Sequence, residues 1–268
     1  MKHFIWLTMI LTAMFMLGGG CSEKSTNSDD LIEGNPDDLT YLQAKQSSQD
    51  IIEDVLGGVD EGIDYLDYEG AGPLMKPADT LFIMMYEDYW YEYRFELLSA
   101  GGHWAQSDSF RFESGVDQYQ QFPDSSTIAF EFRNKLLLEF TEADTSSTVF
   151  NNAAYRFTGI NSNEITINGT TDAGVEIAIG SSEATLDSDS ELDDIVYLAE
   201  GLEYGYENYP ISGTMVVSVG VHSDEQMGEV PAMNYEWTLT VTFNENGYHA
   251  RLEAGDFYWE WDETWGPV

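Results

Sequence analysis

The sequence predicts a mainly β protein, in which a large antiparallel meander curls into a barrel, a half-barrel or a sandwich and follows one amphipathic α-helix. Apolar and polar residues alternate along most of residues 80–268, as they do in strands with one buried and one wet face. Short turns containing Gly or Asn separate roughly ten to twelve such segments. Because so many strands rarely form one flat sheet, we expect the sheet to curl or to fold onto itself.

The segment 41–66 predicts the helix. Its apolar residues are spaced four, three, four and three positions apart, which places them on one helical face: Ile52, Leu56, Val59, Ile63 and Leu66. Gly57, Gly58 and Gly62 weaken this prediction, because a glycine inside a helix costs up to ~1 kcal/mol relative to alanine. We expect the apolar face to pack on the main domain; docking on a helix of another protein is the alternative.

Alternation is clear in two stretches of the predicted β-domain. In "YWYEYRFELL", one face is shared by Tyr91, Tyr93, Phe95 and Leu97. Near the C-terminus, "YEWTLTVTFNENGYHARLEAGDFYWEW" predicts three consecutive strands, because Asn246-Gly247 is a strong hairpin signal and Ala254-Gly255-Asp256 is a second turn. These strands indicate a meander rather than parallel units joined by helices.

Two segments are predicted to interrupt the regular strands. "EITINGTTDAGVEIAIG", residues 164–180, predicts a hairpin with a polar, Gly-containing turn in its middle. The acidic segment 183–209 predicts a short helix around residues 192–202 or a long loop, and it is a possible boundary between two sub-sheets.

The N-terminus has the pattern of an export signal. Lys2 and His3 form a short polar head, residues 4–17 are almost continuously apolar, and Gly18 to Gly20 follow. The apolar run is shorter than the ~20 residues that a membrane-spanning helix needs. Residues 1–20 are therefore predicted to be a secretory signal peptide.

The next residue is Cys21, the single cysteine of the chain. Gly20-Cys21 resembles the end of the lipobox of bacterial lipoproteins, although Gly18 stands where that family usually has Leu. The resemblance covers residues 1–25 and implies cleavage after Gly20 and acylation of Cys21, which would hold the protein on a membrane. The residue after the cysteine is Ser22, whereas an Asp at this position retains many such proteins in the inner membrane. The resemblance therefore implies that the protein is anchored in the outer membrane. The alternative is an ordinary secretory leader with an incidental cysteine. Residues 21–40, rich in Ser, Asn, Asp and Glu, predict a flexible acidic tether.

The charge is strongly negative, with 49 acidic against 10 basic residues and a net charge of −39. Such a surface repels nucleic acid and anionic headgroups, so nucleic acid is not an expected partner. The excess serves either solubility in saline surroundings or the binding of Ca²⁺ or a cationic partner. The candidate calcium ligands lie in the run "DSDSELDD": Asp187, Asp189, Glu191, Asp193 and Asp194. A solvated acidic loop is the alternative interpretation of this run.

No motif indicates catalysis. His103, His222 and His249 lie on separate segments without zinc-site spacing, and no Gly-x-Ser-x-Gly is present. No cofactor other than the possible calcium ion is expected, and a non-enzymatic role is favoured. The abundant aromatic residues either fill the core or bind a ligand, and the candidates for binding are Tyr91, Tyr93, Trp237, Phe257, Trp259 and Trp261.

Three functions fit these observations. A helix followed by a long antiparallel meander is similar to the open-barrel periplasmic carriers of lipoproteins, which implies a small apolar or amphiphilic ligand on a concave aromatic face. The second possibility is an envelope protein that binds or cleaves a glycan through exposed aromatics and carboxylates. The third is a scaffold subunit of an outer-membrane assembly, which would dock on another envelope protein through its helix.

Overall fold

The computed structural model describes residues 31–66, 82–85, 89–115, 118–121, 123–198, 209–223 and 233–265. The predicted leader, Gly20, Cys21 and the first part of the predicted tether lie outside these ranges. The elements are β1 (Ile32–Glu33), α2 (Leu39–Leu66), β2 (Phe82–Met85), β3 (Tyr91–Ser99), β4 (Gly102–Gly115), β5 (Gln118–Gln120), β6 (Ala129–Glu142), β7 (Thr145–Thr158), β8 (Glu164–Ile179), β9 (Ser182–Leu198), β10 (Ser212–Ser223), β11 (Met233–Asn244), β12 (Gly247–Ala254) and β13 (Phe257–Thr264).

All these strands belong to one 13-stranded sheet, in the order β1-β13-β12-β11-β10-β9-β8-β7-β6-β4-β3-β2, with β5 paired to β4. The neighbours are antiparallel except for β1, which runs parallel to β13. The sheet is open, because its two ends do not pair with each other. The predicted mainly β fold with one preceding helix is confirmed, and a closed barrel is excluded.

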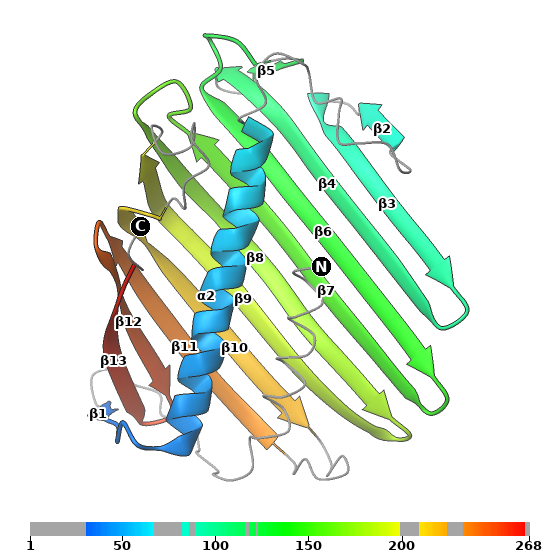
Figure 1. Cartoon of the computed structure of the whole chain (residues 1–268), viewed down its shortest axis with the longest axis vertical. Coiled ribbons are helices and arrows are strands. Elements are labelled where there is room, and N and C mark those ends of the chain that lie inside the picture. The colour runs from blue at the N-terminus through cyan, green and yellow to red at the C-terminus, as the bar shows by residue number, and fades with distance from the viewer. Residues whose placement is uncertain are drawn as a thin grey trace.

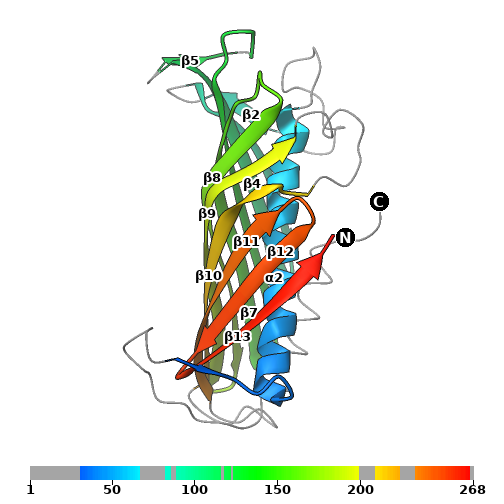
Figure 2. The same ribbon diagram turned by 90° about the vertical axis from the view of Figure 1, so that its left-hand side faces the viewer.

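The single described helix lies on one face of the sheet. α2 crosses the strands diagonally (Figure 1), and the sheet is twisted and bends toward the side on which α2 lies (Figure 2). We call this side of the sheet the inner face and the opposite side the outer face. Within the described residues, no helix is both long and apolar enough to cross a membrane.

The helix begins where the sequence provides a cap. The backbone N–H of Tyr41 donates to the carboxylate of Asp38 at 3.3 Å, which satisfies one of the unpaired amides at a helix N-terminus. The predicted apolar face of α2 is buried against the sheet, with Ile52, Val59 and Ile63 in the core. This face is therefore occupied by the chain's own sheet rather than presented to another protein.

The end of the predicted tether is not free. Ile32 pairs with Phe257 and Glu33 with Tyr258, so β1 adds a short strand to the edge of the sheet. The backbone N–H of Gly34 also donates to the carbonyl of Tyr258 at 2.8 Å. A tether that extends to residue 40 is therefore wrong, because residues 32–34 are fixed to β13.

Two other predicted interruptions are wrong for one physical reason. β8 is a continuous strand of 16 residues, with a bulge between Ile167 and Gly169 where a turn was predicted. β9 is a continuous strand of 17 residues that pairs with β8 and β10, so no helix, loop or sub-sheet boundary begins at residue 183. Residues 199–208 of that predicted segment lie outside the described residues. In both strands small polar residues, among them Thr171, Ser188 and Ser190, are buried on the inner face. Small polar residues are also typical of turns, so the sequence predicted an interruption where the structure has continuous strands.

The C-terminal meander is confirmed. Asn244 pairs with Gly247 across a two-residue turn, so the turn residues are Glu245 and Asn246, one position earlier than the signal suggested. The second turn contains Gly255, whose φ of 58° favours glycine.

Candidate functional site

The predicted binding aromatics all have side chains on the inner face, but they lie in two separate groups. Tyr91 and Tyr93 are on β3 near one edge of the sheet, whereas Trp237, Phe257, Trp259 and Trp261 are on β11 and β13 near the other. Four of the six, Tyr91, Tyr93, Trp237 and Trp261, are buried. The structure does not bring the six together into one binding surface.

The C-terminal group packs on the chain's own N-terminal segment. Tyr41 of α2 stacks on Trp259, with ring centroids 5.0 Å apart and an interplanar angle of 8°. Lys45 Nζ lies 4.9 Å from the centre of the Trp261 ring, a favourable cation–π contact. Trp259 Nε1 donates to the carbonyl of Asn35 at 3.2 Å. These aromatics hold the start of α2 on the sheet.

The other group belongs to an aromatic core. The rings of Tyr91 and Tyr93 lie 5.4 Å and 5.8 Å from that of Phe110, and Tyr91 OH donates to the carbonyl of Gln121 at 2.8 Å. Phe110 in turn contacts Phe130, which is fully buried. Tyr91 and Tyr93 therefore fill the core, which was the alternative to binding a ligand.

The acidic run lies on a strand and not in a loop. Along β9 the side chains of Asp187, Asp189 and Glu191 are exposed on the outer face, while the residues between them are buried on the inner face. Although Asp187 is exposed, its partial burial raises the pKa of this carboxyl group, and the nearby carboxylate of Asp172 raises it further. Among the described residues, no three carboxylate, imidazole or thiol groups lie close enough together to hold a metal ion. The geometry gives no support to the predicted calcium site.

Asp193 continues that exposed row, since it pairs with Thr214 of β10 in the same register, whereas Asp194 lies at an irregular point of the strand. Asp194 has a φ of 50°, and the pairing of β9 with β10 shifts register at the same point. Its backbone N–H donates to Asn168 Oδ1 at 2.9 Å, and Asn168 Nδ2 donates to its carboxylate at 3.2 Å. Asp194 thus joins the two irregular points of β8 and β9.

The inner face has an exposed apolar area that sequence reasoning missed. Leu97 pairs with Trp104 and Trp104 with Leu138, in one row across β3, β4 and β6. Phe140 and Ile179 lie on the same face at the same end of their strands. The exposed fractions are 54% for Leu97, 38% for Trp104, 39% for Phe140 and 49% for Ile179. We call Leu97, Trp104, Leu138, Phe140 and Ile179 the apolar corner.

The helix does not reach the apolar corner. α2 packs on the other halves of the same strands, against Phe132 of β6 and against Tyr155 and Phe157 of β7. Figure 1 shows α2 crossing these strands near one end, while their opposite ends extend beyond it. Contiguous exposed apolar area of this kind marks a binding surface more often than isolated apolar residues do.

A polar band separates the apolar corner from the residues under α2. It consists of Gln106 and Asp108 on β4, Asn134 on β6 and Asn151 on β7, all on the inner face. Asn134 Nδ2 donates to Asp108 Oδ1 at 2.7 Å, and Gln106 Nε2 donates to the same oxygen at 3.4 Å. Asn151 Oδ1 is buried, and no group of the described residues donates a hydrogen bond to it.

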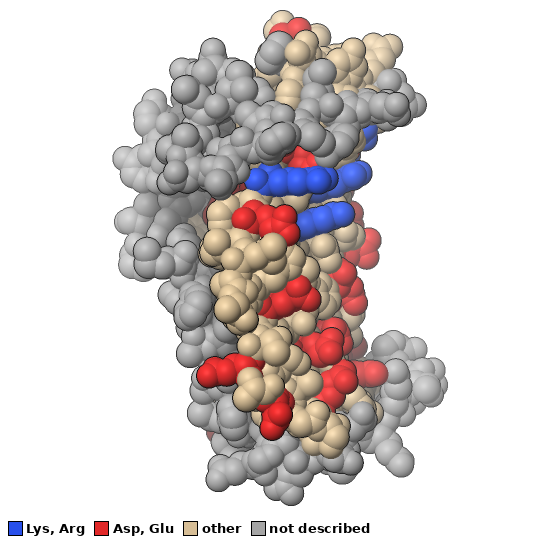
Figure 3. All heavy atoms as spheres, turned by 90° about the vertical axis from the view of Figure 1, so that its right-hand side faces the viewer, with Lys and Arg blue, Asp and Glu red and all other residues tan. Residues whose placement is uncertain are grey.

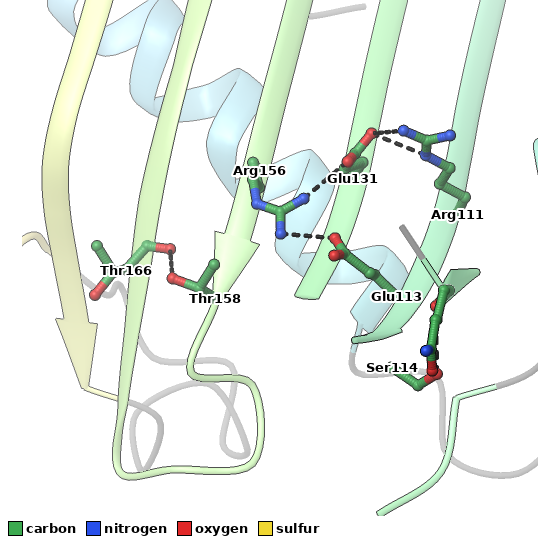
Figure 4. A network of polar contacts seen from close by, with 8 residues as sticks. Arg111, Glu113, Ser114, Glu131, Arg156, Thr158 and Thr166 are labelled. Carbon is green, nitrogen blue, oxygen red and sulfur yellow. Dashed lines mark hydrogen bonds and ion pairs between the residues drawn. The ribbon is translucent and has the colours of Figure 1, made fainter. Parts of the chain in front are cut away.

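The outer face carries a cluster of cations that was also missed. Glu131 of β6 accepts from Arg111 Nε at 2.9 Å and from Arg156 Nη1 at 2.8 Å (Figure 4). Arg156 also pairs with Glu113 at 2.6 Å. Viewed from the β2 and β3 side, Lys and Arg gather in one zone, with Asp and Glu mostly on the rest of that side (Figure 3). Arg111, Glu131 and Arg156 alternate with core aromatics along β4, β6 and β7. This alternation is the sequence pattern from which their common face could have been predicted.

Aromatic rings cover part of this cluster. Arg111 lies over the rings of Trp90 and Tyr119, at 4.6 Å and 3.7 Å, and Arg133 lies 4.1 Å from the centre of the Trp90 ring. These contacts hold β5 and the residue before β3 against the outer face. The cluster is built mainly from internal pairs, and its clearest role is structural.

Comparisons with protein-family models, with curated protein sequences and with solved structures give no match.

Proposed function

We propose that the protein is a lipid-anchored, non-enzymatic protein of the cell envelope that holds an apolar or amphiphilic ligand on the apolar corner. The observation that carries this proposal is the exposure of Leu97, Trp104, Phe140 and Ile179 at one end of the inner face. Because each of these side chains is about half exposed, covering one with a ligand contributes on the order of 1 kcal/mol. Several of them together support the binding of a single alkyl chain.

The proposed lipid anchor and the proposed localisation are inferred from the N-terminal sequence. Acylation of Cys21 would hold the protein on a membrane, and Ser22 favours the outer membrane. A test is metabolic labelling with a radioactive or alkyne-bearing fatty acid in a bacterial host. The wild-type chain is expected to incorporate label and to fractionate with membranes, whereas the C21S variant is expected to lose both properties. Labelling of C21S would contradict the anchor.

The other two functions have less support. Stacking on a glycan would require exposed rings, and most of the aromatics predicted for that role are buried in the core. Docking through the helix would require a free apolar face on α2, and Ile52, Val59 and Ile63 are already packed on the sheet. The apolar corner is left as the surface with the clearest binding chemistry.

The binding experiment uses the C21S chain, so that no covalently attached acyl group competes. Titration with the fluorescent apolar probe N-phenyl-1-naphthylamine is expected to give saturable enhancement of fluorescence. L97N and F140N are each expected to weaken binding about tenfold, which corresponds to ~1.4 kcal/mol.

The matched control is L98N. Leu98 is the neighbour of Leu97 in β3, it is 70% exposed, and its side chain lies on the outer face. L98N is expected to bind the probe like the parent chain. Equal weakening by L97N and L98N, or no saturable binding by the parent chain, would contradict the proposed function.

A further inference from the structure

The chain enters the fold at the end of the sheet where the β3/β4 hairpin turns. The backbone N–H of Ile32 donates to the carbonyl of Asp256, in the turn between β12 and β13, at 2.9 Å. Because antiparallel neighbours alternate in direction, the β3/β4, β6/β7 and β8/β9 turns lie at that same end, whereas the β7/β8 and β11/β12 turns lie at the opposite end. Figure 1 shows β1 and the start of α2 on this side of the sheet. We call the end at Ile32 and Asp256 the entry end.

The proposed lipid anchor is close in sequence to the entry end. Residues 22–31 join Cys21 to β1, and a segment of that length spans at most about 35 Å when fully extended. An acylated Cys21 would therefore hold the entry end near the surface of the bilayer. Such a short connection gives the bilayer a high effective concentration, so even a small apolar contact with it is populated.

The β3/β4 hairpin exposes apolar side chains on both faces of the sheet at the entry end. Leu97 and Trp104 form a cross-strand pair on the inner face, and Leu98 pairs with His103 on the outer face. Leu98 is 70% exposed, the highest value among the large apolar side chains of the described residues. The hairpin tip, residues 99–101, is exposed as well. A ligand on the inner face would leave Leu98 uncovered, whereas a bilayer surrounds an inserted tip on both faces.

Ionisable groups limit how far this tip can enter a bilayer. The ring nitrogens of His103 contact Glu139 at 2.9 Å and Glu96 at 3.1 Å, and charged groups are costly in the hydrocarbon region. Residues 97–102 contain no charged side chain. At ~3.3 Å per residue, the tip extends about 7 Å beyond His103. This length matches the ~5–10 Å by which interfacial segments enter the boundary between headgroups and acyl chains.

We propose that the anchored protein docks on its own bilayer through the β3/β4 hairpin, with Leu98 and the hairpin tip inserted at the boundary between headgroups and acyl chains. This inference depends on the lipid anchor of the proposed function. It also makes that bilayer the source of the ligand, because Leu97 and Trp104 belong to the apolar corner as well. The corner therefore opens toward the lipid surface, where a tryptophan side chain is favoured.

The contact is apolar and not electrostatic. The β6/β7 turn, at the same end of the sheet, carries the exposed side chains of Glu142 and Asp144, which repel anionic headgroups. Vesicles of phosphatidylcholine, whose headgroup has no net charge, are therefore the bilayer used in the test.

A fluorescent label at the hairpin tip tests the docking. Cys21 is the single cysteine of the chain, so in the acylated protein A100C supplies the single free thiol for a nitrobenzoxadiazole label. After reconstitution of the whole mature chain into the vesicles, the label is expected to emit at shorter wavelength and to be quenched by doxyl-labelled phosphatidylcholine. The control E245C places the label in the β11/β12 turn, at the opposite end of the sheet. Its quenching is expected to be about threefold weaker or less.

Two substitutions in the labelled A100C chain separate insertion of the hairpin from general proximity to the bilayer. L98N is expected to reduce the quenching about threefold, because it places a polar amide at the inserted position. The matched control is V216N, since Val216 is a 36% exposed side chain on the outer face of β10, away from the hairpin. V216N is expected to leave the quenching unchanged. In the C21S chain, both variants are expected to bind N-phenyl-1-naphthylamine like the parent.

The outcomes distinguish the two proposals. Quenching of A100C no stronger than that of E245C, or equal losses in L98N and V216N, would overturn the docking, while saturable binding of the probe by the C21S chain would keep the proposed ligand site. Failure of the C21S chain to bind the probe, with A100C still quenched, would overturn the ligand site and keep the docking.

Discussion

Gly62 of α2 lies directly over the ring of Phe157 of β7: a Cβ added at Gly62 would be 2.6 Å from Phe157 Cζ. One helical turn earlier, a Cβ at Gly58 would be 2.9 Å from the hydroxyl oxygen of Tyr155. The glycines that weaken the helix in the sequence therefore allow α2 to approach the sheet closely.

G62A is expected to lower the free energy of unfolding by about 1–3 kcal/mol, because the added methyl group overpacks a fully buried ring. The matched control is G57A, since nothing lies within 4 Å of a Cβ at Gly57. G57A is expected to raise stability by up to ~1 kcal/mol through helix propensity. Urea unfolding followed by tryptophan fluorescence measures both; a G62A chain as stable as the parent would show that the helix is not pressed against Phe157.

Tyr41 is expected to fix the start of α2 through its ring. Y41A removes the stack on Trp259 and the edge contact with Trp261 and is expected to cost about 2–4 kcal/mol of unfolding free energy. Y41F keeps the ring and is expected to cost less than ~1 kcal/mol. Limited proteolysis should cut Y41A faster between residues 31 and 40. Equal losses in Y41A and Y41F would assign the effect to the hydroxyl group instead.

Glu131 is the centre of the outer-face ion network. Its side chain is 18% exposed and that of Arg111 is 13% exposed. E131Q leaves two arginines without their shared carboxylate and is expected to cost about 1–3 kcal/mol of unfolding free energy. The control is E253Q, which breaks the more exposed pair with Arg251 and is expected to cost less than ~1 kcal/mol. Similar losses in the two variants would count against a special role for the network.

The contacts of His103 are expected to make the free energy of unfolding depend on pH. Its ring nitrogens contact Glu139 at 2.9 Å and Glu96 at 3.1 Å, and the hydrogen bond to Glu139 is the largest cause that raises the pKa of His103 above its usual value of 6.5. The charged ring is therefore favoured in the folded state. The stabilisation is fully present below pH 6.5 and is lost as pH rises through the raised pKa.

The measurement compares the parent chain with H103Q in urea at pH 5.5, 6.5, 7.5 and 8.5. The stability advantage of the parent over H103Q is expected to be largest at the lowest pH and to decline above pH 6.5. An advantage that grows with pH would reverse the assigned sign.

The strands and the helix were predictable because their evidence is local. Alternation along β3 or β11, and the four-three spacing of α2, follow from residues close together in the sequence. The continuity of β8 and β9 was not predictable in this way, since Thr171, Ser188 and Ser190 are small polar residues that lie buried on the inner face.

The candidate site depended on information that no local pattern contains. Leu97 and Trp104 are close in the sequence, but Leu138 and Phe140 join them only through the register of β4 with β6. The predicted aromatics lie on one face of the sheet, yet which of them stay exposed depends on where α2 lies. Sequence alternation selects a face, and the position of the helix decides which part of that face is free.

The parallel pairing of β1 with β13 joins the first described strand to the last one. The N-terminal end of a chain is synthesised first, so β1 and the start of α2 cannot pack on Phe257 and Trp259 until the final hairpin has been made. Such distant contacts make folding slow relative to a chain of local hairpins. The fold is therefore complete only after the C-terminal strands have been made. A chain truncated before residue 257 would lack the strand with which its own N-terminal segment pairs.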